Sequence, residues 1–511
     1  MEQEQPTSKF KNAPEVDIVS SEEYFDPKRF PDFRYSFPDQ EVLFRRVVAY
    51  FYRFLDGLTN NKSYFFTNPY RDAQKPYAEL IDFLRSEGLT ESAGFLDERH
   101  NDAPFFYRFF IRGAYPKGIT DGKHIEMTAN SCGRDLNTLF SKGVGEFLER
   151  YFLTLYHKKK LMYASPKFLA QKNISFIPLE QIDEFSKEQK TAYPKRKWSE
   201  ESILGWEKVE RVATGKKILV PAQLVYWNYE LADEVGEPFL REPNTNGAGG
   251  MFSKEEAVLS GLYELIQRDS FLIYWLDTLS PPQIDPKSVP NVTFQNIISD
   301  SDRYGFKIYC LNTTLDTNIP SFIVVIIDSS GQGPYFTCGG GASLDPVESL
   351  LSALQEAWSV YISQRDRPLF ELPQDFTPFR SHIDREERMY IAANPAYAKN
   401  YEFFVSGPVK KLSEYTFLQT PGFSSPKEEL DFAVRQVEAL GPGYEIYAHL
   451  VSNPLLKKLG YHVAKVVVPE IMSLYLHEPN APLAKKRLKS VSAKLGFFSG
   501  NKFNSWPHPF P

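Results

Sequence analysis

Two glutamates in the segment SKGVGEFLERY are spaced so that they can act together. Glu146 and Glu149 lie three residues apart, which places both on one face of a predicted helix. Lys142 precedes Glu146 by one turn, and Arg150 lies beside the pair. The sequence therefore predicts a small group of charged side chains on a single helical face.

The same spacing returns twice further along the chain. In both later segments, carboxylates and other polar side chains follow one another at intervals of about one helical turn. Arg268 flanks the first of these stripes. The stripes consist of Glu256, Ser260, Glu264 and Gln267 in the second segment, and of Glu348, Ser352 and Glu356 in the third. Three predicted helices thus share one design.

Two interpretations of these stripes remain open. Each stripe can be the solvated polar face of an amphipathic surface helix. The sequence neighbours of Glu146 and Glu264 are mostly apolar, however, which predicts helices that are buried on much of their circumference. Buried carboxylates repel one another and lose hydration, so they need a cation. Mg²⁺ suits this role because proteins hold it with one or two carboxylates plus the phosphates of a nucleotide.

A glycine-rich segment precedes each of the three predicted helices. These segments read NSCGRDLN, NTNGAGGMFS and FTCGGGASLDP. A glycine-rich entry to a helix can present backbone N–H groups and the positive end of the helix dipole to phosphate oxygens. None of the three matches an established phosphate-binding motif. From the residues alone we expect a Mg²⁺–nucleotide site between acidic helices, and the reaction stays open.

The composition indicates a folded chain with an ordinary charge balance. Its 511 residues are 42% hydrophobic and 24% charged, and a net charge of −6 without a basic tail offers no footprint for nucleic acid. No apolar run reaches the length of a membrane span. Three scattered cysteines, Cys132, Cys310 and Cys338, fit neither a disulfide framework nor a paired-Cys zinc site, and we interpret them as small buried thiols. We expect a cytoplasmic protein that binds neither nucleic acid nor membrane.

Helical and strand patterns alternate over most of the chain, which predicts a mixed α/β or α+β fold. The expected helices cover 41–57, 77–86, 136–158, 253–276, 346–364 and 427–440. The expected strands lie within 103–130 and at 217–229, 306–313, 320–328, 402–406, 444–451 and 461–468, and 178–200 is expected to be a solvated excursion. We divide the chain into an extended or partly disordered lead-in (1–39), an N-terminal helical/β region (40–125) and a catalytic domain (126–511).

Five ordered segments resemble the YcaO family, and within it the cyclodehydratase component of thiazole/oxazole-forming peptide maturases. The resemblance covers roughly residues 55–511 and implies β-sheets flanked by long helices around a central ATP/Mg²⁺ cleft. The segments are LFSKGVGEFLERY, ILVPAQLVY followed by NTNGAGGMFSKEEAVLSGLYELIQRD, GGGASLDPVESLLSALQEA, LGYHVAKVVVPEI and the final WPHPFP.

The resemblance implies an ATP-dependent enzyme of peptide natural product biosynthesis. In its reaction a Cys, Ser or Thr side chain attacks the neighbouring backbone amide carbonyl. ATP then phosphorylates the oxygen of the adduct, and phosphate leaves to give a thiazoline or oxazoline ring. An amide oxygen is a poor leaving group, so its conversion into phosphate makes the dehydration feasible, while bound metal ions neutralise the developing charge.

The resemblance also implies roles for individual residues. The metal ligands would be Glu146, Glu149, Glu264 and Gln267, and the nucleotide contacts would be Glu256, Arg268, Lys142 and Glu356. The tail at Pro507, Pro509 and Pro511 would project its free carboxylate into the site to orient substrate and transfer protons. Prolines suit such an arm because they stiffen it and lower the entropy lost on docking. His508 is either a substrate contact or a solvated imidazole.

Several positions depart from the family pattern and keep two alternatives open. Met251 and Phe252 stand where a Gly-Asn pair is common, and Lys142 stands where a small hydroxyl residue is frequent. Gln267 stands where a second glutamate is usual, Phe252 where an asparagine contacts nucleotide, and Ser352 where an arginine is frequent. Replacing Glu by Gln removes a charge, which lowers metal affinity unless a group such as Glu356 substitutes. The alternatives are a scaffold subunit without ATP turnover, and an enzyme that forms thioamides or amidines on the same fold.

The resemblance implies that such an enzyme works with partners. These are a ribosomal precursor peptide, an E1-like protein that binds the leader peptide, and an FMN-dependent dehydrogenase that oxidises azoline to azole. Residues 1–110 do not resemble the E1-like segment, so we expect leader recognition by a separate protein. A homodimer is compatible with the resemblance.

Overall fold

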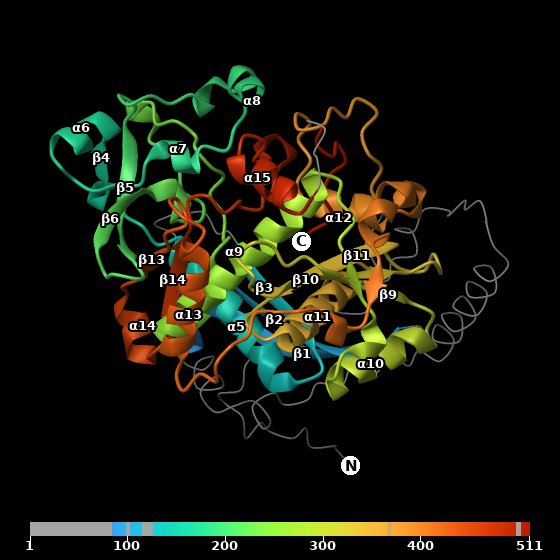
Figure 1. Cartoon of the computed structure of the whole chain (residues 1–511). Helices are drawn as coiled ribbons and strands as arrows, with labels where there is room; N and C mark the ends of the chain where they lie inside the picture. The colour runs from blue at the N-terminus through green and yellow to red at the C-terminus, as the bar shows by residue number, and fades with distance from the viewer. Residues whose placement is uncertain (1–83, 99–102, 115–125, 366, 368, 497–501) are drawn as a thin grey trace, which may run out of the picture.

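The computed structural model describes residues 84–98, 103–114, 126–365, 367, 369–496 and 502–511 (Figure 1). The expected lead-in at 1–39 and the expected helix at 41–57 lie outside the described residues. So does most of the expected helix at 77–86, of which residues 84–86 are described and helical. The domain boundaries drawn in that region stay predictions.

Three sheets form the framework, and the mixed fold expected from the sequence is confirmed. The first, in the order β1-β2-β3, consists of β1 (Thr90–Glu98), β2 (Phe106–Ala114) and β3 (Glu126–Gly133). The second, in the order β11-β10-β9-β8-β12, consists of β8 (Gln283–Ile284), β9 (Lys307–Asn312), β10 (Ser321–Ile327), β11 (Phe336–Ala342) and β12 (Val409–Lys410). The third, in the order β4-β5-β13-β14-β7 with β6 beside β5, consists of β4 (Met162–Ala164), β5 (Leu204–Arg211), β6 (Lys217–Pro221), β7 (Ala248–Met251), β13 (Tyr447–Leu450) and β14 (His462–Val467).

The three acidic helices are built to one plan. A strand, β3, β7 or β11, leads into an N-cap side chain that accepts a backbone N–H of the first turn, and each helix places a glutamate eleven residues after its cap. The helices are α5 (Leu136–Leu153), α9 (Lys254–Leu276) and α11 (Pro346–Gln364), their caps are Asp135, Ser253 and Asp345, and the glutamates are Glu146, Glu264 and Glu356. The predicted common design is therefore a repeated strand–helix unit.

The three units close into a ring. Each helix packs on the strand that leads into it and also on the strand of the next unit: α5 contacts β7, α9 contacts β11, and α11 contacts β3. Figure 1 shows α5, α9 and α11 gathered in the middle of the molecule. Because the units have equal lengths from cap to glutamate, this ring brings corresponding carboxylates from distant parts of the chain toward one centre.

Most of the glycines before these helices lie in strands and not in the expected loops, whereas Gly247 lies in a turn before β7. A Cβ on Gly249 would lie 2.0 Å from the carbonyl oxygen of Ala257, and one on Gly339 would lie 2.2 Å from the backbone nitrogen of Ala357. One on Gly341 would lie 2.1 Å from the carbonyl oxygen of Ser349. These glycines allow a helix backbone to pack directly on its strand.

Two further expectations were wrong. The segment 402–406 forms a 3₁₀ helix (Glu402–Val405) instead of a strand, since Phe404 turns into the core beside Trp275. The segment 178–200 is not a solvated excursion, because it buries Phe185 and Gln189, and the amide of Gln189 donates to the carbonyls of Pro479 and Ala481. Its polar composition hid these contacts, which join segments far apart in sequence.

The remaining helices surround this framework. None of the helices in the described part of the chain has an apolar stretch long enough to cross a bilayer. They are α6 (Pro166–Gln171), α7 (Leu179–Ile182), α8 (Lys187–Ala192), α10 (Val292–Arg303), α12 (Arg385–Ala393), α13 (Pro426–Glu438), α14 (Pro454–Leu459) and α15 (Lys486–Lys494).

Candidate functional site

Glu149 on α5 is the carboxylate with the most strongly perturbed titration at the centre of the ring. Burial, the Glu264 carboxylate and the Glu146 carboxylate together raise the pKa of Glu149 to about 8, against the opposing effects of Arg150 and the Gly250 backbone N–H. Glu146 itself forms an ion pair with Arg150 one turn along the helix. The two glutamates predicted from spacing therefore do share one environment.

Glu264 on α9 faces this pair from the second unit. Its Oε2 accepts the backbone N–H of Gly247 at 2.5 Å, and its Oε1 forms an ion pair with Arg268 at 2.9 Å. Arg268 also donates to the side-chain oxygen of Asn246. Each of the first two units thus pairs its glutamate with an arginine four residues later.

Glu356 on α11 completes the set from the third unit. Its Oε2 accepts the backbone N–H of Gly340 at 2.5 Å and lies 3.5 Å from the amide nitrogen of Gln267. Burial raises the pKa of Glu356, opposed by the Gly340 N–H and by the charges of Arg268 and Lys142. We call Glu146, Glu149, Glu264 and Glu356 the acidic cluster.

Lys142 bridges the first and third units. Its ammonium lies 3.4 Å from the hydroxyl of Ser352 and 3.4 Å from the side-chain oxygen of Gln355. Desolvation lowers the pKa of Lys142, while the Glu356 carboxylate acts in the opposite direction. The lysine thus occupies the rim of the acidic cluster where α5 meets α11.

Two cations of the site were missed by sequence reasoning. Lys465 on β14 is buried and donates to the carbonyl of Asn244 at 2.6 Å. Burial lowers its pKa to about 7, although the charges of Glu264 and Glu149 favour the ammonium. Arg385 on α12 lies in the electrostatic field of Glu146, Arg150 and Arg268. Lys465 carried a signal, since a lysine within the apolar strand VAKVVV needs a buried partner, whereas nothing local marks Arg385.

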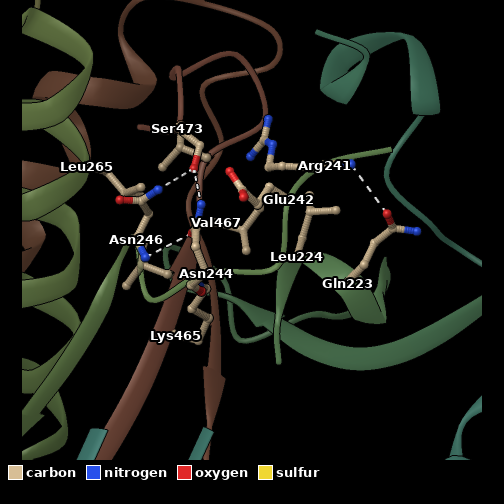
Figure 2. Close-up of a pocket in the computed structure, with 12 residues that line it drawn as sticks. Gln223, Leu224, Arg241, Glu242, Asn244, Asn246, Leu265, Lys465, Val467 and Ser473 are labelled. Carbon is tan, nitrogen blue, oxygen red and sulfur yellow. Dashed lines mark hydrogen bonds between the residues drawn. The ribbon is translucent and has the colours of Figure 1, made fainter. Parts of the chain in front are cut away.

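A small polar pocket adjoins the acidic cluster (Figure 2). Asn244 and Asn246 both donate to the Ser473 hydroxyl and to the Leu474 carbonyl. Arg241 reaches the pocket from the opposite wall and pairs with Glu184 at 2.9 Å. Because Asn246 also accepts from Arg268, the pocket wall is tied to the arginine of the second unit.

Glu256 and the tail prolines also belong to the site residues predicted from the sequence. Glu256 is exposed in the first turn of α9, where it accepts the Ser253 hydroxyl at 2.6 Å. Pro507 and Pro509 are buried and Pro511 is partly exposed, and the neighbouring Phe510 packs on Phe271 of α9. The interpretation of the cysteines is confirmed, because Cys132, Cys310 and Cys338 are all buried free thiols.

The donor set fits a divalent cation and a phosphate-bearing ligand. Two carboxylates with raised pKa values, Glu149 and Glu356, are held together with Glu264, and a cation would relieve their repulsion. Within the described residues no three His, Cys, Asp or Glu side chains are already gathered in metal-binding geometry. The ion pairs explain this, since Glu146 and Glu264 each hold an arginine. The ligand roles of Glu146, Glu149, Glu264 and Gln267 therefore stay predictions.

Comparison with known proteins identifies the family. Residues 141–472, more than half of the chain, match a family model described as YcaO cyclodehydratase, ATP- and Mg²⁺-binding. A protein of Methanothermobacter thermautotrophicus is 27% identical over 274 residues, covering 52% of this chain and 65% of its own length. A protein encoded in the tfuA 3′ region of Rhizobium leguminosarum bv. trifolii is 30% identical over 155 residues, covering 29% of this chain and 36% of its own length. The chain thus spans less than two thirds of either relative.

Solved structures share the fold at low sequence identity. A heterocyclase in complex with substrate and cofactor superposes with a TM-score of 0.66 at 19% identity, over 86% of this chain and 57% of the heterocyclase. YcaO from Methanopyrus kandleri bound with AMPPCP and Mg²⁺ gives 0.54 at 16% identity, over 78% and 90% of the two chains. The Escherichia coli microcin synthetase McbBCD complex gives 0.51 at 14% identity, over 82% and 96%. ATP and Mg²⁺, the cofactors expected from the sequence, are therefore confirmed by the family description.

Proposed function

Because this chain belongs to the YcaO family, we propose that it is an ATP-dependent peptide cyclodehydratase. The observation that carries the proposal is the convergence of Glu149, Glu264 and Glu356 from three separate helices into one half-buried cluster beside Arg268. A half-buried cluster of like charges is costly to the fold, and a cation with a polyphosphate ligand offsets that cost.

The proposed reaction removes one water from a precursor peptide for each ring formed. The thiol or hydroxyl of a Cys, Ser or Thr attacks the carbonyl carbon of the neighbouring backbone amide, and a hemiorthoamide results. Its oxygen takes the terminal phosphoryl group of ATP, ADP is released, and the C–O bond then breaks to expel phosphate. The adduct loses its hydroxyl proton on phosphorylation and its N–H proton when the C=N bond forms, and the departing phosphate takes up one of the two. The products are an azoline ring, ADP, hydrogen phosphate and one proton, so atoms and charges balance.

The chain's carboxylates would bind the cations of this reaction. We assign ligation to Glu146, Glu149 and Glu264, with Gln267 contributing its amide oxygen. Mg²⁺ would supply charge neutralisation for phosphoryl transfer. To ligate it, Glu146 and Glu264 must turn away from their arginines. Arg150 and Arg268 would then be free to meet phosphate oxygens.

Glu356 would compensate for the glutamine at position 267. Its half-buried carboxylate lies within hydrogen-bond range of Gln267, and the charges of Arg268 and Lys142 act on it. The amide of Gln267 donates to Glu356, which leaves the amide oxygen available to a metal. The third unit thus contributes the negative charge that the second unit lacks.

The other assigned residues would hold nucleotide and substrate. Lys142 and Glu356 lie on opposite sides of the junction between α5 and α11, and Glu256 lies at the open N-terminal end of α9. Pro507, Pro509 and Pro511 belong to a segment that packs on α9, which would orient the peptide near the cluster.

We propose that the enzyme works within a multiprotein synthetase. The McbBCD structure is a complex, and the heterocyclase structure contains a substrate. For this chain the proposed partners are a ribosomal precursor peptide, an E1-like protein that binds its leader, and an FMN-dependent dehydrogenase.

The test is reconstitution with a precursor peptide and an E1-like protein from the neighbouring genes, in the presence of Mg²⁺ and ATP. We expect each ring to reduce the peptide mass by one water and to release one phosphate. Glu149→Ala and Glu264→Ala should abolish both signals, while the surface control Glu180→Gln should retain them. Phosphate release by Glu149→Ala at the wild-type rate would refute the site.

Two observations favour a second candidate, a scaffold subunit without ATP turnover. Gln267 supplies no negative charge, and Phe252 is packed edge-on against Tyr461 where a polar nucleotide contact is usual in the family. If the chain is this scaffold, its partners form rings only in its presence. The variants Glu149→Ala and Glu264→Ala would then support ring formation as well as the wild type does. A peptide mass that shows incorporation of sulfur or closure to an amidine would instead identify an enzyme that forms thioamides or amidines.

A further inference from the structure

The segment 502–511, which we call the tail segment, inserts a histidine into a buried polar socket. His508 is 0% exposed, and the socket around it consists of Arg388 on α12, Tyr475 and Glu478, which are 0%, 2% and 1% exposed. The Arg388 guanidinium contacts the Nε2 of His508 and donates to the Tyr475 carbonyl at 2.9 Å. Nε2 of His508 also lies 3.2 Å from the Tyr475 carbonyl. Arginine can only donate, so the closer contact with Arg388 requires Nε2 to accept and the imidazole to be neutral. The solvated imidazole considered from the sequence is therefore wrong.

The socket contains more polar groups than its own contacts satisfy. Glu478 lies 3.9 Å from Arg388, too far for a direct hydrogen bond, and burial raises the pKa of Glu478 to about 7. The Nδ1 of His508 and the remaining Arg388 nitrogens have no hydrogen-bond partner among the described residues. Without His508 the buried Arg388 guanidinium would have one more N–H group without an acceptor, which is energetically costly. The socket is thus built to hold an acceptor from the tail segment.

The apolar face of the tail segment packs on the helix that carries Glu264 and Arg268. The ring of Phe271 lies 5.6 Å from that of His508 and 4.7 Å from that of Phe510. Phe271 follows Arg268 by three residues, so it lies within one turn of the acidic cluster. Trp506 adds a hydrogen bond to the Tyr401 hydroxyl at 2.8 Å. The tail segment therefore packs against both α9 and α12.

The helix that contacts His508, α12, also carries Arg385, a cation near the acidic cluster. Arg385 precedes Arg388 by three residues on α12, so the two lie about one turn apart. Four charged groups act on Arg385: the cations Arg150 and Arg268 and the carboxylates Glu146 and Glu386. No ion pair joins Arg385 to another residue in the described part of the chain. An arginine that has no ion pair among the described residues and lies beside Arg150 and Arg268 is available to meet an added anion.

We propose that Arg385 binds a phosphate group of the nucleotide, and that the contact between His508 and Arg388 positions Arg385 for this task by fixing α12 against the tail segment. The inference deepens the proposed function, on which it rests for the identity of the anion. Arg385 is the binding residue, whereas Arg388 and His508 act only through it and are positioning residues.

The experiment separates docking of the tail segment from nucleotide binding. Hydrogen exchange, followed by mass spectrometry without nucleotide, measures docking, and calorimetric titration with AMPPCP and Mg²⁺ measures binding. His508→Phe keeps an aromatic ring but lacks the acceptor, so we expect faster exchange in the tail segment and α12, and at least tenfold weaker binding. His508→Gln offers an acceptor near the same place and should restore both.

Arg385→Ala supplies the second arm. We expect tenfold weaker AMPPCP binding with wild-type exchange in the tail segment, and partial recovery in Arg385→Lys. The surface control Arg303→Ala should change neither readout. Wild-type exchange in His508→Phe would overturn the positioning role, and wild-type affinity in Arg385→Ala would overturn the phosphate contact. Neither readout depends on turnover, so a failed reconstitution would refute the proposed activity while these results still decide the inference.

Discussion

Gln267 and Glu356 meet across the interface of α9 and α11, with 3.5 Å between the amide nitrogen and the carboxylate oxygen. The contact joins the position where a charge is missing to the nearest half-buried carboxylate of the next unit. Glu356 is held in place by the Gly340 N–H, so it cannot move away from an added negative charge without losing that hydrogen bond.

Gln267→Glu should therefore destabilise the protein without Mg²⁺ and bind Mg²⁺ more tightly. The new carboxylate repels Glu356 when no cation is present and adds an oxygen ligand with full charge when one is. We expect affinity for Mg²⁺ with AMPPCP to rise about tenfold, or ~1.4 kcal/mol, measured by calorimetry. Glu180→Gln serves as the control, and an unchanged affinity in Gln267→Glu would show that position 267 does not face the cation.

Glu149→Gln should make the free protein more stable at alkaline pH. The pKa of Glu149 is raised from 4.5 to about 8 in the fold, so the folded state binds more protons than the unfolded state between these values. Stability from this group is consequently present below pH 4.5 and is lost as the pH rises through 8. At pH 9 the variant should gain about 1–2 kcal/mol over wild type, with a smaller gain at pH 6. Urea unfolding at both pH values measures this, and a gain that does not grow with pH contradicts it.

Gly249→Ala should prevent the second unit from forming correctly. The added methyl group would lie 2.0 Å from the Ala257 carbonyl oxygen, so α9 must move away from β7. We expect a loss of about 3 kcal/mol or failure to fold, measured by thermal unfolding. Gly422→Ala is the matched control because a Cβ there meets no atom within 4 Å and should change stability little.

His508→Gln should reduce the loss of stability on acidification. Burial and the Arg388 charge hold the pKa of His508 well below its usual 6.5, so the unfolded state takes up the proton first. The wild-type fold therefore loses stability as the pH falls below about 6.5, and glutamine cannot contribute to this loss. Unfolding free energies at pH 7.5 and 5.5 measure the difference. Equal pH dependence in both proteins would show that His508 already carries a proton in the fold.

The three cysteines should not react in the native protein. Burial raises the pKa of the Cys310 and Cys338 thiols, and the thiolate is the reactive form. We expect iodoacetamide to label none of the three until denaturant is added, as read by mass spectrometry, and Cys338→Ser to keep phosphate release. Rapid labelling of the folded protein would place a thiol in an accessible site.

Local sequence patterns determined the helices and the faces on which their polar residues lie. Glu146 and Glu149 were predicted to share a face from spacing alone, and the caps at Asp135, Ser253 and Asp345 begin helices close to the expected positions. Such features depend on residues within one or two turns, so they are readable from a short stretch of sequence. The resemblance to a known family added the roles assigned to these residues.

Only the tertiary structure decided which groups meet. Most of the glycine-rich residues lie in strands, where Gly249, Gly339 and Gly341 admit the backbone of the helix that follows each strand, and this close packing carries no signal in the local pattern. Arg385, Lys465 and the contact between His508 and Arg388 were not predicted, since Glu146, Asn244 and Arg388, their respective partners, lie more than a hundred residues away. Electrostatic interactions between such segments depend on distance and burial in three dimensions, and a local sequence pattern determines neither quantity.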